Sequence, residues 1–210
     1  MNIKLLQNII TNLISSSMRE VREDRDLLDS FSPNQFKSKI NLVNHIKSLN
    51  ILNKNSEIVI FGSWYGSLLI PAFYDEVKKI TCIDQDVKVT SRAKFKLFKD
   101  FNIEWISDDV FSNFRDQFKT TDLFINTSCE HMKPMREWGP APTYKNPWWD
   151  RVSPAYFAFQ SNAMFDIPTH INCVNNIEEF KKQLPDRAEV LIEDEIPDER
   201  GTRFTLIGKI

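Results

Sequence analysis

Short apolar runs that alternate with helical segments constrain this chain more than any other feature of its sequence. Residues 57–61 form an apolar, β-branched run bounded by turn residues, which is typical of a strand buried on both faces. Similar runs follow at 79–84, 103–107 and 122–126, and helical patterns at 67–74 and about 87–98 separate the first three. Strands and helices that alternate at this spacing indicate right-handed βαβ units and a parallel sheet.

Further elements are predicted on either side of this alternation. The amphipathic pattern over 1–17 predicts a helix, and a second helix is expected to begin at Ser32-Pro33, an N-cap followed by proline, and to run to about residue 49. A fifth strand is predicted at 155–160, and 189–193 with 203–208 form an antiparallel hairpin. The polar, Trp- and Pro-rich segment 128–154, which contains Trp138, Trp148 and Trp149, is expected to be an active-site loop.

The length of 210 residues fits a single domain, in which N-terminal helices over 1–55 precede a core over 56–210. Hydrophobic residues make up 41% of the chain, enough to bury a sizeable core. Cys82, Cys129 and Cys173 are odd in number and lack CxxC spacing, which argues against a disulfide framework or a structural zinc site. We expect them to be reduced thiols.

The overall charge excludes a broad electrostatic attraction to nucleic acid. The formal net charge is -2, so nucleic acid is not favoured as a partner. A local basic patch remains an alternative, made of Lys37, Lys39, Lys133, Arg136 and Lys145. No apolar run approaches the roughly 20 residues of a membrane span, and the N-terminus lacks a secretory signal core. A soluble cytoplasmic protein without a membrane partner is therefore expected, of unknown oligomeric state.

Glycines and acidic residues follow the first three predicted strands, at the edge where open α/β sheets bind ligands. Gly62 and Gly66, two of the five glycines, lie in the turn after the first strand, and glycine lets backbone approach a ligand closely. Asp84 ends the second strand, where a carboxylate can accept both hydroxyls of a ribose. Asp108 and Asp109 follow the third strand, where one carboxylate can accept a hydrogen bond from an adenine amino group. Together these positions predict a nucleoside-binding site.

With these motifs, the sequence resembles the class I S-adenosylmethionine-dependent methyltransferases over residues 57–210. The glycine-rich GxGxG loop of that family is here Gly62-Ser63-Trp64-Tyr65-Gly66, with tryptophan in place of the middle glycine. The resemblance implies a Rossmann-like α/β fold, with a mostly parallel seven-stranded sheet, helices on both faces, N-terminal helices and a C-terminal antiparallel hairpin. It also implies that S-adenosylmethionine is the cofactor and that its methyl group passes to an acceptor that the sequence does not identify.

The resemblance also assigns the cofactor site. Asp84 is expected to bind the ribose and either Asp108 or Asp109 to face the adenine. The remaining predicted cofactor-binding residues are Gly62, Ser63, Trp64, Gly66 and Asn126. Phe61 stands where an acidic residue often precedes the first glycine. The amino and carboxylate groups of the cofactor therefore have Gln35, Ser38 and Lys39 of the preceding helix as candidate partners.

In this family the segment after the fourth strand faces the reactive methyl group. Here that segment differs from the Asn/Asp-Pro-Pro-Tyr/Phe motif of enzymes that methylate amino groups of bases or glutamine, which disfavours such acceptors. It contains Glu130 and His131, either of which can remove a proton from an acceptor OH or NH. We predict these two as the catalytic residues.

A second polar cluster follows the fifth predicted strand and is expected to bind the acceptor, because strand ends converge. Its predicted substrate-binding residues are Gln160, Asn162 and His170. Glu130, His131 and His170 could in principle hold a metal ion, but they come from irregular segments without the i, i+4 spacing of helical metal ligands. We therefore predict no metal site.

Other functions compete with methyl transfer. NAD-binding folds share the glycine loop and the acidic residue after the second strand, although the terminal hairpin favours the methyltransferase interpretation. The same cofactor site would also suit aminocarboxypropyl transfer, cofactor cleavage or a non-catalytic nucleoside-binding domain. A tight turn at the glycines and a solvated carboxylate at Asp84 are the structural alternatives for those residues.

Overall fold

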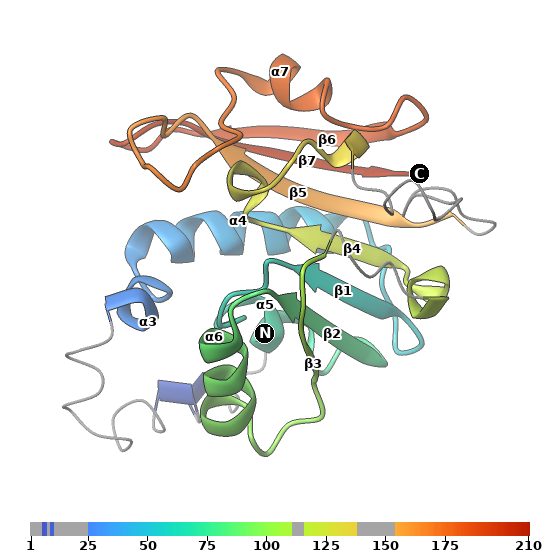
Figure 1. The fold of residues 1–210 in the computed structure, drawn as a ribbon. Helices are drawn as coiled ribbons and strands as arrows, with labels where there is room; N and C mark the ends of the chain where they lie inside the picture. The colour runs from blue at the N-terminus through green and yellow to red at the C-terminus, as the bar shows by residue number, and fades with distance from the viewer. Residues whose placement is uncertain (1–5, 8, 11–24, 111–115, 138–153) are drawn as a thin grey trace.

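The computed structural model describes residues 6–7, 9–10, 25–110, 116–137 and 154–210 of the chain. A seven-stranded sheet in the order β3-β2-β1-β4-β5-β7-β6 runs through the molecule (Figure 1). Its strands are β1 (Glu57–Phe61), β2 (Lys79–Asp84), β3 (Glu104–Ser107), β4 (Leu123–Asn126), β5 (Tyr156–Asn162), β6 (Glu189–Ile196) and β7 (Arg203–Lys209). Strands β1 to β5 are parallel, whereas β7 lies antiparallel between β5 and β6. The predicted Rossmann-like fold class is confirmed.

Alternating side chains of the strands fill a core on each face of the sheet. On β1, Ile58 and Ile60 belong to one core cluster, and Val59 and Phe61 belong to the other. Every one of these side chains is almost completely buried, which explains why the strand has a continuous apolar sequence instead of an alternating one. The two-sided burial inferred from residues 57–61 is therefore confirmed.

Helices and single turns cover both faces (Figure 1). The helical elements are α3 (Arg25–Asp29), α4 (Pro33–Ser48), α5 (Leu69–Phe73), α6 (Val87–Arg92) and α7 (Ile177–Lys181), a π-helical turn (Ala93–Leu97), and the 3-10 turns η2 (Asp116–Thr120), η3 (Cys129–His131) and η4 (Met135–Glu137). Helices α4, α5 and α6 supply buried side chains to the first core cluster. On the opposite face, α7 contributes Phe180 and η2 contributes Phe118 to the second cluster.

Local capping explains where the helices begin. The Ser32 side chain accepts a hydrogen bond from the Gln35 N–H and Pro33 occupies the first turn, so α4 starts where the sequence predicts. The Asp86 side chain caps α6 in the same way. Two predictions were incomplete: the helix expected over 87–98 changes to a π-helical turn after Arg92, and the short helices α3 and α7 were not predicted.

Several predictions fall largely outside the described residues. Of the helix predicted over 1–17, residues 6, 7, 9 and 10 are described and helical, and Ile9 is buried. Trp138, Trp148 and Trp149 lie outside the described part, so their contacts stay predictions. The single-domain organisation also stays a prediction. Within the described ranges, no helix combines the length and the apolar character that crossing a membrane requires.

Candidate ligand-binding edge of the sheet

The turn after β1 adopts the backbone conformation that glycine favours at three of its five positions. Gly62 has φ 53°, Trp64 has φ 49° and Gly66 has φ 63°. A non-glycine residue in this left-handed region costs about 1–2 kcal/mol, yet Trp64 takes the conformation expected of the missing middle glycine. The loop therefore keeps the tight form of a GxGxG turn, and the half-buried indole packs beside Tyr65, with ring centroids 5.5 Å apart.

Asp84 fixes this turn to the end of β2. One carboxylate oxygen of Asp84 accepts the Trp64 N–H at 2.8 Å, and the other accepts the Asp86 N–H at 3.0 Å. The Ser63 N–H donates to the Ile83 carbonyl at 3.1 Å, which adds a second link between the two segments. Burial raises the pKa of Asp84, whereas the two backbone N–H donors lower it. Each carboxylate oxygen can accept more than one hydrogen bond, so Asp84 retains acceptor capacity for a ligand.

The segment after β3 lies against the same strand end. The Asp108 N–H donates to the Asp84 carbonyl at 3.1 Å, and the Asp108 side chain accepts the Asp109 N–H at 2.9 Å. Asp108 is half-buried, whereas Asp109 is exposed. The structure therefore brings Asp108 next to Asp84, as the sequence predicts. Which of the two aspartates meets an adenine stays a prediction.

Asn126 is completely buried and shapes the turn after β4. Its side-chain oxygen accepts the Ser128 N–H at 2.8 Å, and its side-chain amide nitrogen donates to the Met132 sulfur at 3.2 Å. A Cβ added to Gly62 would lie 2.5 Å from the Met132 methyl carbon, so the turns after β1 and β4 are in contact. Asn126 thus stabilises the turn after β4. Its direct contact with a cofactor stays a prediction.

Glu130 and His131 lie in the 3-10 turn η3 directly after β4. The Glu130 side chain is 6% exposed and the His131 side chain is 41% exposed, and the Nε2 of His131 is 4.0 Å from a carboxylate oxygen of Glu130. Burial raises the pKa of Glu130, whereas a hydrogen bond with its own backbone and the charge of His131 oppose this shift. The Nδ1 of His131 lies 3.0 Å from the Thr169 carbonyl. The two predicted catalytic residues are therefore adjacent, and the loop after β5 orients one of them.

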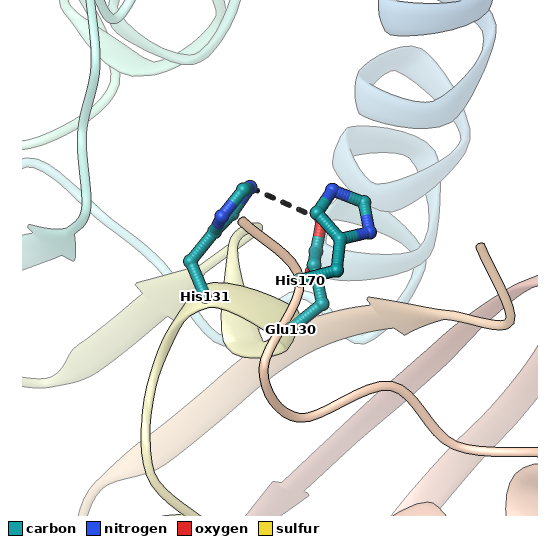
Figure 2. Close-up of side chains that lie close together, drawn as sticks. All are labelled: Glu130, His131 and His170. Atoms are coloured by element: carbon teal, nitrogen blue, oxygen red, sulfur yellow. Dashed lines mark ion pairs between the residues drawn. The ribbon is translucent and has the colours of Figure 1, made fainter. Parts of the chain in front are cut away.

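His170 completes a cluster with these residues (Figure 2). Its ring lies edge-on to the His131 ring, with centroids 4.5 Å apart and an interplanar angle of 85°. The His170 Nδ1 is 3.1 Å from the Asn162 carbonyl oxygen, which also accepts the Met164 N–H at 2.9 Å. Burial lowers the pKa of His170, and His131 acts in the same direction. The convergence of His170 and Asn162 with Glu130 and His131 confirms that the ends of β4 and β5 meet.

Gln160 belongs to a different, fully buried network. Its carbonyl oxygen accepts the Ser38 hydroxyl at 3.0 Å, and its amide donates to the Ser38 carbonyl at 3.2 Å and to the Thr205 hydroxyl at 3.0 Å. This network ties α4 to β5 and β7. Because both ends of the Gln160 amide have protein partners, acceptor binding by Gln160 stays a prediction that this geometry does not support.

Arg203 was not predicted as a site residue, although it lies close to the cluster. It is buried at the start of β7, and its charge acts on Glu130, Lys39 and His170. Burial lowers the pKa of Lys39 to about 7, and Arg203 lowers it further, while Glu130 and Asp29 oppose the shift. An arginine within a buried strand is the sequence signal that could have identified this residue.

Comparison with solved structures shows the same fold in several methyltransferases. The N-methyltransferase NodS from Bradyrhizobium japonicum, in complex with S-adenosyl-l-homocysteine, is similar with a TM-score of 0.66 and 12% identity, over 98% of this chain and 97% of NodS. Magnesium protoporphyrin IX methyltransferase from Synechocystis with bound SAM has a TM-score of 0.60 at 12% identity, over 82% of this chain and 78% of that enzyme. A SAM-dependent methyltransferase from Aquifex aeolicus has a TM-score of 0.57 at 18% identity, over 86% and 99% of the two chains.

Sequence comparison adds no closer relative. No protein-family model matches the chain, and no curated protein matches it significantly. The structural likeness and the strand order nevertheless agree with the fold that the sequence resemblance implies. The chain has the fold of the class I S-adenosylmethionine-dependent methyltransferases.

Proposed function

We propose that this protein is a methyltransferase that binds S-adenosylmethionine along the ends of β1, β2 and β3. The observation that carries the proposal is the position of Asp84, which ends β2 and holds the Trp64 N–H of the glycine loop at 2.8 Å. A strand-end carboxylate beside such a loop suits a ribose diol. Structures of the same fold with bound SAM or S-adenosyl-l-homocysteine support this cofactor.

The sheet order favours this cofactor over a dinucleotide. The dinucleotide-binding fold has a mostly parallel sheet with the strand order 3-2-1-4-5-6. Here, in contrast, β7 lies antiparallel between β5 and β6. The left-handed backbone at Gly62, Trp64 and Gly66 gives this turn the tight form of a GxGxG loop. These features fit a nucleoside with a short chain attached.

Each residue at this edge of the sheet would have a separate role in binding or catalysis. S-adenosylmethionine, when bound, supplies a methyl group on a positively charged sulfur. Asp84 would accept the ribose hydroxyls, and Asp108 or Asp109 would accept a hydrogen bond from the adenine. Lys39, whose charge is coupled to Glu130 and Arg203, would meet the carboxylate end of the cofactor, and that anion would favour the charged form of the lysine. Glu130 and His131 would bind or deprotonate the acceptor, while positioning in a partly buried site supplies much of the rate.

A cytoplasmic location is part of the same proposal. Cys82, Cys129 and Cys173 are all free, and burial raises the pKa of the Cys82 and Cys129 thiols. Unreactive free thiols are typical of a reducing compartment.

Calorimetric titration of the purified full chain with S-adenosylmethionine, S-adenosylhomocysteine and NAD tests the cofactor. We expect the first two to bind and NAD not to bind. Asp84→Asn should weaken binding by about 1–3 kcal/mol, because charge-assisted hydrogen bonds to the ribose are lost. Asp86→Asn is the matched control: it removes the same charge two residues away, and asparagine also caps α6. Equal affinity in wild type and Asp84→Asn would disprove the assigned pocket.

A further inference from the structure

Three groups that commonly bind metal ions meet at the ends of β4 and β5. Glu130, His131 and His170 each offer one ligand atom, and these atoms all lie within 4.8 Å of one another. Figure 2 shows the His131 ring across the ion pair from the Glu130 carboxylate, which is partly hidden behind the His170 ring in this view. Two residues come from η3 and the third from the loop after β5, so no periodic sequence motif connects them.

The hydrogen bonds of the two histidines fix which nitrogen can bind a ligand. A backbone carbonyl only accepts, so the contact between the His131 Nδ1 and the Thr169 oxygen places a proton on Nδ1. The Asn162 oxygen is identified by the Met164 N–H that it accepts, so the His170 Nδ1 must also donate. In the neutral rings, both Nε2 atoms therefore keep a lone pair. Metal-binding histidines are oriented in this manner, by an oxygen that accepts from the other ring nitrogen.

One oxygen of the buried Glu130 carboxylate lacks a hydrogen-bonding partner among the residues that the structure describes. Its Oε2 is buried and accepts no hydrogen bond within the described part of the chain. The carboxylate also has a hydrogen bond with the backbone of Glu130 itself, and His131 is the ion-pair partner of Oε1 at 4.0 Å. An unsatisfied buried carboxylate costs stability unless it is protonated or a cation compensates it. Lys39 and Arg203 act on Glu130 through space, but neither satisfies Oε2.

We propose that Glu130, His131 and His170 form a binding site for one first-row divalent transition metal ion, such as Mn²⁺, Fe²⁺, Co²⁺ or Zn²⁺. Two imidazoles and one carboxylate are a ligand set that these ions accept with further positions open. Metal–ligand bonds of about 2.1 Å require the ligand atoms to approach to about 3.4 Å in a tetrahedral site. Rotation of the half-exposed His131 side chain can supply much of this movement, because its ring is not enclosed by the core.

The open positions give the metal a defined role at this edge of the sheet. The site lies in the turn next to Met132, which contacts Gly62 of the glycine loop. An oxygen atom of the acceptor, coordinated to the ion, would be held beside the proposed cofactor site and made more acidic. This role rests on the proposed function, whereas the metal site itself depends on neither the cofactor nor the acceptor.

The test is a titration of the full, untagged chain, stripped of metal with a chelator, with CoCl₂ followed by visible absorption and calorimetry. We expect one Co²⁺ per chain, with a spectrum that lacks thiolate charge transfer. Glu130→Gln, His131→Gln and His170→Gln should each weaken binding at least about tenfold, because each removes one ligand. His45→Gln is the matched control, since His45 is the third histidine of the chain and pairs with Asp194 away from the cluster.

Three results of this titration would overturn the metal site. The first two are failure of the wild-type chain to bind Co²⁺ and equal binding by wild type and His131→Gln. The third is loss of binding in Cys173→Ser but not in His131→Gln, because Cys173 lies on the Nδ1 side of His170. Circular dichroism of each variant reports folding, and His131→Gln is the decisive variant because His131 is the most exposed of the three ligands. If cofactor binding fails in calorimetry while Co²⁺ still binds, the proposed function is wrong and the metal site stands.

Discussion

The polar groups at the ends of β1, β2 and β3 are held by backbone hydrogen bonds, whereas those at the ends of β4 and β5 and at the start of β7 are buried side chains. In the first region Asp84 is held by two backbone N–H groups of nearby turns. In the second region Gln160 bonds to Ser38, which is distant in the sequence, and Asn162 bonds to His170. Arg203 and Glu130 are ionisable and buried. Buried polar networks lose stability steeply when one member is removed. The second region should therefore be much more sensitive to substitution.

The largest effect is expected from Gln160→Ala. The substitution leaves the Ser38 and Thr205 hydroxyls without their partner and opens a cavity between α4 and the sheet. We expect a loss of about 2–4 kcal/mol in the free energy of unfolding, measured by urea denaturation. Gln85→Ala, at an exposed glutamine after β2, is the matched control and should change stability by less than about 0.5 kcal/mol. Similar losses for both variants would remove the distinction between the two regions.

A pair of glycine substitutions compares the strand β7, which begins at Arg203, with the turn after β1 at the level of the backbone. A Cβ at Gly208 of β7 would lie 2.1 Å from the Glu189 carbonyl oxygen and 2.5 Å from the Phe157 ring. Gly208→Ala should therefore cost about 1–3 kcal/mol or more through overpacking. At Gly66 the φ of 63° makes alanine unfavourable by about 1–2 kcal/mol, and the closest atom is the flexible end of Ile70. A smaller unfolding free energy for Gly66→Ala than for Gly208→Ala would contradict this order.

Stability should also depend on pH through Lys39. Its pKa is about 7 in the folded chain, because of burial and Arg203, and Glu130 and Asp29 face it as opposing charges. The unfolded chain keeps this proton up to a pH of about 10.4, so between these values the unfolded state binds more protons. The free energy of unfolding should rise with pH across this window, by up to about 1.4 kcal/mol per unit. Lys39→Met should flatten the rise in metal-free protein. An unchanged slope would show that Lys39 is not responsible.

The smallest effect is expected at the surface. His45 and Asp194 link α4 to β6 at 3.0 Å, and their side chains are 30% and 29% exposed. Solvent screens such a pair, so Asp194→Asn should cost no more than about 0.5 kcal/mol in thermal or urea unfolding. A loss comparable to that of Gln160→Ala would mean that surface charges, and not the buried network, hold α4 on the sheet.

The two regions also differ in how far the sequence could predict them. The parallel strands, the turn from Gly62 to Gly66 and the position of Asp84 follow from local patterns, because each depends on residues that are close in the chain. The hydrogen-bonding partners in the second region do not follow from local sequence patterns. Nothing local predicts that the Thr169 carbonyl orients His131, and the structural role of Gln160 depends on Ser38, which lies far away in the chain. The prediction of no metal site relied on spacing, which does not report contacts between loops, and it stays a prediction until metal binding is measured.

A crystal structure of the chain grown with S-adenosylhomocysteine and MnCl₂ would test most directly that one sheet edge holds both sites. We predict density for the ribose hydroxyls at the Asp84 carboxylate, and an anomalous peak from manganese between Glu130, His131 and His170. Density for the nucleoside away from the loop between Gly62 and Gly66 would contradict the cofactor site. Nucleoside density at Asp84 without a manganese peak would contradict the metal site alone.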